Sequence, residues 1–192
     1  MSRSGFRPSM RFCANMIPGL ALALVLPLGV SRAQEPPPPL QYKLKAAFLY
    51  HFAQFVEWPA GTFAETNSPL VIAVLGENPF GEELERTIRG KLIDAHPCVI
   101  REIRSAAEAR TNCHLLFISS SEKSRLPEII ESLRGVSVLT VSETDGFTET
   151  GGMINFVPQG KKIRFKINDD AAKSARLKIR AKLLSLGIDS AP

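Results

Sequence analysis

Two short clusters of thiol and imidazole side chains are the residues best suited to chemistry. His96 lies two positions before Cys98, and Cys113 is followed directly by His114. These four side chains are ligands that tetrahedral zinc accepts, but their spacing matches no common structural zinc pattern. A signal peptide, described below, would also place the cysteines in an oxidising compartment, where disulfides persist. We therefore predict no metal and a Cys98–Cys113 disulfide, with two reduced thiols or pairing to another chain as alternatives.

Motifs of several common enzyme classes are missing from the sequence. It has no GxxxxGK[ST] loop and no GxSxG elbow, and the turn at 76–79 lacks the glycine spacing of a dinucleotide site. The serines at 119–121 have no obvious histidine partner, and Asp169 and Asp170 suit the first turn of a helix. We predict that the protein is not an enzyme and needs no cofactor.

A glycine-rich stretch gives the sequence its one candidate ligand pocket. Consecutive glycines at 151 and 152 precede a strand pattern, which is typical of a turn or bulge entering a hairpin. The alternative is that they form a pocket floor. Phe147, Phe156 and the cationic Arg164 or Lys166 would then contact a small anionic or aromatic ligand.

Residues 1–33 have the organisation of a secretory signal peptide. Three arginines precede an apolar run over 17–30, and Ser31-Arg32-Ala33 supplies the small residues that a signal peptidase reads. The run is about 14 residues long, whereas a membrane-spanning helix needs roughly 20. We predict cleavage after Ala33 and a periplasmic location, with an uncleaved anchor as the alternative.

Loss of the signal peptide nearly neutralises the chain. It removes four of the 24 basic residues and none of the 19 acidic ones, which leaves a net charge of +1. The mature protein therefore lacks the strong positive charge typical of nucleic-acid binding. Residues 34–39 form a stiff proline-rich leader, and we predict a single domain over 40–188.

The elements that position these residues follow from apolar periodicity. Apolar residues at three- and four-residue spacing predict a helix over 40–58, and period-2 alternation predicts a hairpin of 153–157 with 163–167. A long cationic helix is expected over 169–187. Between them we expect strands at 70–75, 98–103, 115–118 and 136–141, alternating with helices at 79–90, 105–110 and 121–134. This order predicts an α/β fold, a three-layer α/β/α sandwich with a mixed sheet and a C-terminal hairpin plus helix.

The first and last of these helices are the expected contact surface for a protein partner. The first is aromatic beyond a single stripe, with Tyr50 and Trp58 among its members, and the last has Arg176 and Arg180 on a cationic face. We predict that these four residues bind a partner. The alternatives are that the aromatic residues belong to the core and that the cationic face is simply solvated.

Several segments, taken together, resemble the YfiR-like family of periplasmic regulatory proteins. They are YKLKAAFLYHFAQFVEWP at 42–59, LVIAVLGENPFGEEL at 70–84, NCHLLFIS at 112–119, VSVLTVSETDGFTETGGMINFV at 137–157, and KIRFKINDDAAKSARLKIRAKLLSLG at 162–187. They occur in the order of the family and cover nearly all of the mature chain. The fold that the resemblance implies agrees with the one predicted from periodicity.

The resemblance implies a regulatory function. It implies a periplasmic repressor that binds the periplasmic sensor part of an inner-membrane diguanylate cyclase and lowers cyclic-di-GMP synthesis. It also implies an outer-membrane lipoprotein that sequesters the repressor, a homodimer, and disulfides. The alternative is a periplasmic small-molecule binding module that reports to a membrane sensor kinase or cyclase.

Overall fold

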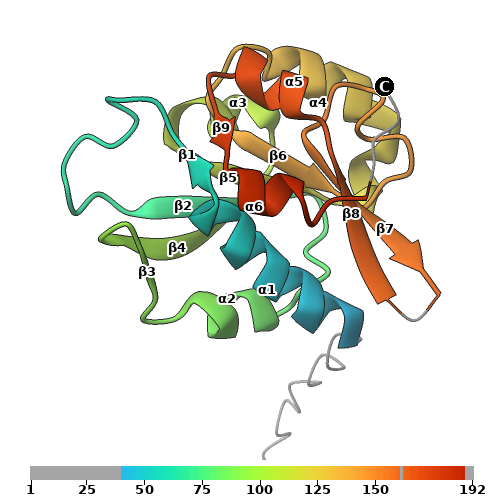
Figure 1. Ribbon diagram of the computed structural model, residues 1–192, viewed down its shortest axis with the longest axis horizontal. Helices are drawn as coiled ribbons and strands as arrows, with labels where there is room; N and C mark the ends of the chain where they lie inside the picture. The colour runs from blue at the N-terminus through green and yellow to red at the C-terminus, as the bar shows by residue number, and fades with distance from the viewer. Residues whose placement is uncertain (1–39, 161, 189–192) are drawn as a thin grey trace, which may run out of the picture. The chain divides into compact units, whose positions relative to one another are not determined.

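The computed structural model describes residues 40–160 and 162–188 of the chain (Figure 1). The predicted signal peptide, its cleavage site and the proline-rich leader lie outside these residues. The elements in chain order are α1 (Leu40–Gln54), β1 (Val56–Glu57), β2 (Leu70–Leu75), α2 (Glu83–Ile88), β3 (Leu92–Ile93), β4 (His96–Ile103), α3 (Ala106–Asn112), β5 (Leu115–Ile118), η1 (Ser120–Arg125), α4 (Leu126–Ser132), β6 (Leu139–Ser142), β7 (Ile154–Gln159), β8 (Lys162–Ile167), α5 (Asp169–Ser174), β9 (Lys178–Ile179) and α6 (Ala181–Leu184).

A seven-stranded mixed sheet in the order β3-β4-β2-β5-β6-β7-β8 forms the middle layer. Neighbouring strands from β4 to β7 pair in parallel, and β3 and β8 pair antiparallel at the two edges. The central strands are apolar on both faces because both faces are covered. One core cluster joins the sheet to α1, α2 and the C-terminal segments, and another joins it to α3 and α4. The predicted three-layer α/β/α architecture is confirmed, as is the C-terminal hairpin of β7 and β8.

Helix α1 lies on the sheet through a cluster of aromatic rings. The ring of Phe52 is 4.9 Å from that of Phe165 on β8 and 5.6 Å from that of Phe156 on β7, between ring centroids. Phe48 contacts the same two rings. These edge-on and tilted contacts add to the energy of burying large apolar side chains, so α1 is held against the C-terminal hairpin.

Two of the predicted helices end earlier in the structure, because β1 and β9 pair where those helices were expected to continue. The first helix ends at Gln54 instead of residue 58, because Val56 and Glu57 are extended and pair antiparallel with Ile179 and Lys178. Pro59 also disfavours a helical conformation at the residue before it.

The predicted continuous helix over 169–187 is wrong. It begins as expected, where the Asn168 side chain accepts a hydrogen bond from the backbone N–H of Ala171, but α5 ends at Ser174. Arg176 adopts a left-handed conformation with φ of 61°, and the N–H of Leu177 bonds to the carbonyl of Ala172. This is a Schellman-type helix end. The chain then forms β9 and only afterwards the short helix α6.

Smaller differences concern the extent of two helices and one short edge strand. The predicted helix over 79–90 is confined to α2, and the one over 121–134 is divided into η1 and α4, with a proline in the first turn of α4. The short edge strand β3 was not predicted. None of these differences changes the layers.

Replacing Phe52 tests the packing of α1. Because Phe52 is fully buried in the ring cluster, we expect Phe52→Ala to lower the free energy of unfolding by about 3–5 kcal/mol. Leu44 lies on the same helix and is 47% exposed, so Leu44→Ala should change it by no more than about 0.5 kcal/mol. Urea unfolding measures both. Equal losses in the two variants would contradict this packing.

Candidate interaction site

The two-stranded sheet of β1 and β9 is the centre of the candidate site. Glu57 of β1 forms ion pairs with Lys178 at 3.1 Å and with Arg180 at 3.2 Å, and Arg180 lies 3.9 Å from Asp94. Hydrogen bonds from Lys178 and then Arg180 lower the pKa of Glu57. Charges of both signs therefore alternate along this exposed ribbon.

Behind the ribbon, four aromatic residues form a stack. The Phe63 ring lies nearly parallel to the imidazoles of His96 and His114, with centroids 3.7 and 4.6 Å away. Trp58 packs edge-on against Phe63 and His114. The stack therefore joins the loop after β1 to the start of β4 and to the residue before β5.

The two imidazoles bond to backbone groups of that loop and of β2. His114 Nδ1 accepts from the backbone N–H of Val71, the other ring nitrogen bonds to the carbonyl of Thr62, and His96 Nδ1 donates to the carbonyl of Ser68. Burial, helped by His96, lowers the pKa of His114 to about 4, so this imidazole is neutral at neutral pH. In the described part of the chain, no group of three or more His, Cys, Asp or Glu side chains is placed to hold a metal.

A cavity of about 280 Å³ opens beside the stack. Its walls come from β1, the following loop, β3 and the start of β4, and the residues that line it are Val56, Glu57, Trp58, Phe63, Leu70, Ile93, Asp94 and His96. The indole N–H of Trp58 is buried and has no hydrogen-bond partner among the described residues. The hollow is lined by apolar side chains together with His96 and the carboxylates of Glu57 and Asp94.

The end of α1 and the edge strand β3 extend this site. The Tyr50 hydroxyl donates a hydrogen bond of 3.4 Å to the carbonyl of Leu92 and accepts one from Gln54, and the Lys91 ammonium lies 4.4 Å from the Tyr50 ring centroid. The side chain of Leu92 is 59% exposed. We call the residues Tyr50, Glu57, Trp58, Leu92, Asp94 and Arg180 the ribbon surface.

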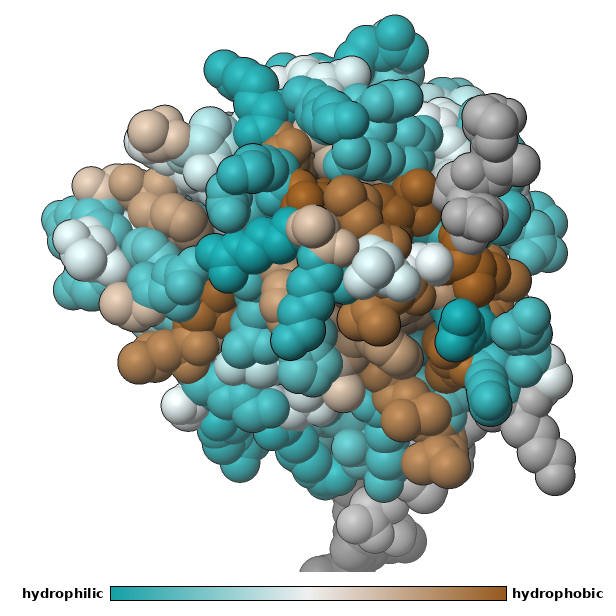
Figure 2. All heavy atoms as spheres, in the orientation of Figure 1, coloured by the Kyte–Doolittle hydropathy of each residue, from teal (hydrophilic) through white to brown (hydrophobic). Residues whose placement is uncertain are grey.

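The ribbon surface includes three of the four residues predicted to bind a partner. Tyr50, Trp58 and Arg180 gather there, although β9 and not a long helix positions Arg180. Arg176 is exposed at the end of α5, and no hydrogen bond or ion pair among the described residues joins it to the other three. Figure 2 shows hydrophilic and hydrophobic side chains intermixed over this face of β9, α6 and α1.

The predicted ligand pocket around Phe147 is wrong. Phe147 is fully buried in the cluster on the α3 and α4 face, whereas Phe156 is buried in the cluster on the α1 face. Arg164 lies opposite Val157 in the hairpin, and Lys166 forms an ion pair with Glu149 at 3.2 Å. The two rings are separated by the sheet, so these four side chains do not line one cavity.

Both cysteines are free thiols, and the predicted Cys98–Cys113 disulfide is not formed. Cys98 packs against the core on the α1 face, whereas Cys113 belongs to the core on the opposite face and bonds to the carbonyl of Leu115. The sheet lies between the two clusters, so the short stretch of sequence between the cysteines does not bring the thiols together. Burial raises the pKa of the Cys113 thiol to about 12, so it is inert.

Comparison with known proteins identifies the family. Residues 42–188 match the family model described as YfiR/HmsC-like. The chain belongs to the YfiR/HmsC-like family. This is a family of periplasmic regulators in cyclic-di-GMP signalling, and it is regulatory rather than catalytic. No curated protein matches the chain significantly. Within the described residues, no helix is long and apolar enough to cross a membrane. The YfiR/HmsC-like match includes the whole ribbon surface.

The buried histidine predicts a dependence of stability on pH. The unfolded chain, with an ordinary histidine pKa of 6.5, binds more protons than the folded chain between pH 6.5 and about 4. We therefore expect the free energy of unfolding to be unaffected by titration of His114 above pH 6.5. It should fall by about 2 kcal/mol as the pH falls towards 4. The free energy of unfolding, measured across this pH range, should depend less on pH in His114→Gln than in the unaltered protein. The exposed His51 offers the control His51→Gln, and an unchanged dependence in His114→Gln would contradict the assignment.

The thiol assignment predicts how the cysteines react. In denaturant without reductant, the mature protein should show two free thiols by a colorimetric thiol reagent. In the folded protein, Cys113 should be protected because it is buried, while the half-buried Cys98 reacts slowly. Cys98→Ser should leave one thiol, which appears only after unfolding. A denatured protein without free thiols would instead establish a bridge.

Proposed function

We propose that this protein binds the periplasmic sensor part of an inner-membrane diguanylate cyclase and represses it, lowering cyclic-di-GMP. Membership of a regulatory family in this signalling system is the observation that carries the proposal. A regulator without chemistry of its own acts by contact, so its partner needs a surface. The ribbon surface is the part of the described chain that meets this need.

The ribbon surface has the composition of a protein-binding site. Aromatic and arginine side chains are enriched where binding energy concentrates. Here Trp58 lines the hollow, Arg180 pairs with Glu57 and Asp94 of its wall, and Tyr50 bonds to the adjoining strand β3. Leu92 adds an exposed apolar side chain at the edge. Such a patch can bury its apolar centre while its charged rim remains in contact with water.

The charges of the rim favour a partner with both signs of charge. Glu57 and Arg180 are 42% exposed and Asp94 is 72% exposed, measured on their side chains. Exposed ion pairs of this kind contribute roughly 0–1 kcal/mol. These side chains can therefore leave their ion pairs and bind complementary charges on the cyclase at little cost in free energy. Complementary charges support specificity and fast association.

The remaining family features extend the proposal. Export by cleavage after Ala33 places the regulator in the periplasm, where the sensor part of the cyclase lies. A homodimer, and release of the cyclase when an outer-membrane lipoprotein sequesters the regulator, complete the proposed cycle. They follow from the family resemblance.

Affinity capture tests the proposed partner. The protein carrying a C-terminal tag is expressed in its own host, membranes are solubilised in detergent, and captured proteins are identified by mass spectrometry. We expect a membrane diguanylate cyclase to be recovered. Leu92→Glu should reduce recovery at least tenfold, because it buries an unpaired charge where an apolar side chain would contact the partner.

Leu186→Glu is the matched control for this experiment. Leu186 is also an exposed leucine, but it lies beside the opposite edge of the sheet. The residue after it, Gly187, lies close to the side chain of Ile167 on β8. Recovery should be unchanged in this variant. Loss in both variants, or in neither, would contradict the assignment of the ribbon surface. Capture of no cyclase by the unaltered protein would contradict the proposed function itself.

A further inference from the structure

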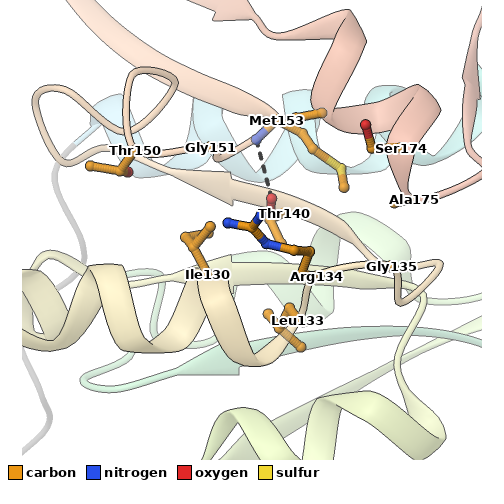
Figure 3. Close-up of a pocket in the computed structure, with 11 residues that line it drawn as sticks. Ile130, Leu133, Arg134, Gly135, Thr140, Thr150, Gly151, Met153, Ser174 and Ala175 are labelled. Atoms are coloured by element: carbon orange, nitrogen blue, oxygen red, sulfur yellow. Dashed lines mark hydrogen bonds between the residues drawn. The ribbon is translucent and has the colours of Figure 1, made fainter.

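A second cavity, also of about 280 Å³, lies away from the ribbon surface. It is enclosed by the end of α4, Thr140 of β6, the loop before β7, and α5. Figure 3 shows Ile130 of α4 and Arg134 of the turn after α4 approaching it, with Met153 and Ser174 on the opposite side. Gly151 and Met153 line it, so the glycine-rich stretch does border a pocket, although not the predicted one.

Two glycines with positive φ line this cavity. Gly151 has a left-handed φ of 97°, and a side chain there would come within 3.3 Å of Ile130. A glycine is therefore needed for the loop to lie against α4. Gly135 also has a positive φ, and a side-chain carbon built there would meet no atom within 4 Å. Gly151 therefore permits the close approach of the loop to α4, whereas Gly135 borders open space.

The walls combine apolar side chains with hydroxyl groups. Ile130, Leu133 and Met153 supply the apolar area. The buried Thr140 hydroxyl accepts a hydrogen bond of 3.1 Å from the N–H of Met153, which leaves its own proton for another acceptor. Thr150 and Ser174 already donate to backbone carbonyls. A ligand would therefore meet apolar walls and few free donors.

Arg134 is the charged residue among the described lining residues. Its guanidinium pairs with Glu131 at 2.6 Å, and both side chains are largely exposed. An exposed pair between the last turn of a helix and the turn that follows it is weak. A carboxylate in the cavity can replace Glu131 and receive two parallel charge-assisted hydrogen bonds from the guanidinium.

We propose that this cavity binds a small monocarboxylate with an apolar body, held by Arg134 at the mouth and by the apolar walls inside. The cavity is slightly smaller than those of drug-sized ligands, which occupy roughly 300–1,000 Å³. Ala175 lines it, and β9 begins three residues later. The ligand therefore contacts the segment that leads into the ribbon surface, and the regulator can respond to a small acid.

Phenylacetate and hexanoate are the probes that test this site, one aromatic and one aliphatic. Each is titrated up to about 10 mM, a range that covers the weak affinities of such small ligands, into the isotope-labelled protein. We expect the amide signals of Gly135, Gly151 and Met153 to shift and saturate. Phenylacetamide, which has the same shape without the charge, should bind at least tenfold more weakly.

Three variants separate the site from non-specific binding. Arg134→Gln should weaken phenylacetate binding at least tenfold and leave phenylacetamide unaffected. Ser174→Leu places an apolar side chain in the cavity from an exposed position and should abolish binding of both without lowering the melting temperature. Arg89→Gln is the matched control, because Arg89 is likewise an exposed arginine that follows a helix and pairs with a glutamate of that helix.

Three results would each overturn the proposal. They are the absence of saturable shifts at these backbone amides with both acids, equal binding of phenylacetate and phenylacetamide, and equal weakening by Arg134→Gln and Arg89→Gln. None of these outcomes bears on capture of a cyclase, because the measurement needs only the isolated protein.

Discussion

Burial of α1 against the C-terminal hairpin is the constraint on which the rest of the structure depends. The rings of Phe48 and Phe52 lie on those of Phe156 and Phe165, which come from strands more than a hundred residues later in the chain. Once α1 is placed in this way, the chain that leaves it runs beside the segment that follows α5. The β1 and β9 pairing and its ion pairs around Glu57 follow from this placement.

The ribbon surface is therefore a product of long-range packing and not of any local motif. Its members come from α1, β1, β3 and the segment after β9, and each would be an ordinary solvated residue in isolation. The histidine and phenylalanine stack behind it fixes the loop after β1 with backbone hydrogen bonds. A rigid support beneath exposed side chains lowers the entropic cost of binding a partner, which suits a regulator that acts by contact.

The sequence predicted the layers well, because apolar periodicity reports burial directly. It failed where helix-forming residues adopt another structure. Over 175–180, burial alternates at every second residue, yet alanine, leucine, lysine and arginine favour a helix, and the pairing with Val56 overrides that preference. Sequence spacing likewise could not show on which face of the sheet Cys98 and Cys113 or Phe147 and Phe156 lie. The alternation of polar and apolar residues at 175–180 was the signal available for β9.

Hydrogen–deuterium exchange on the complex tests the central claim, that the ribbon surface binds the regulated enzyme, most directly. The protein is compared alone and with the purified periplasmic part of the captured cyclase. The account predicts added protection in segments 56–58, 91–94 and 178–180, with β8 unchanged. Protection confined to β8 and α6, with these three segments unchanged, would contradict it.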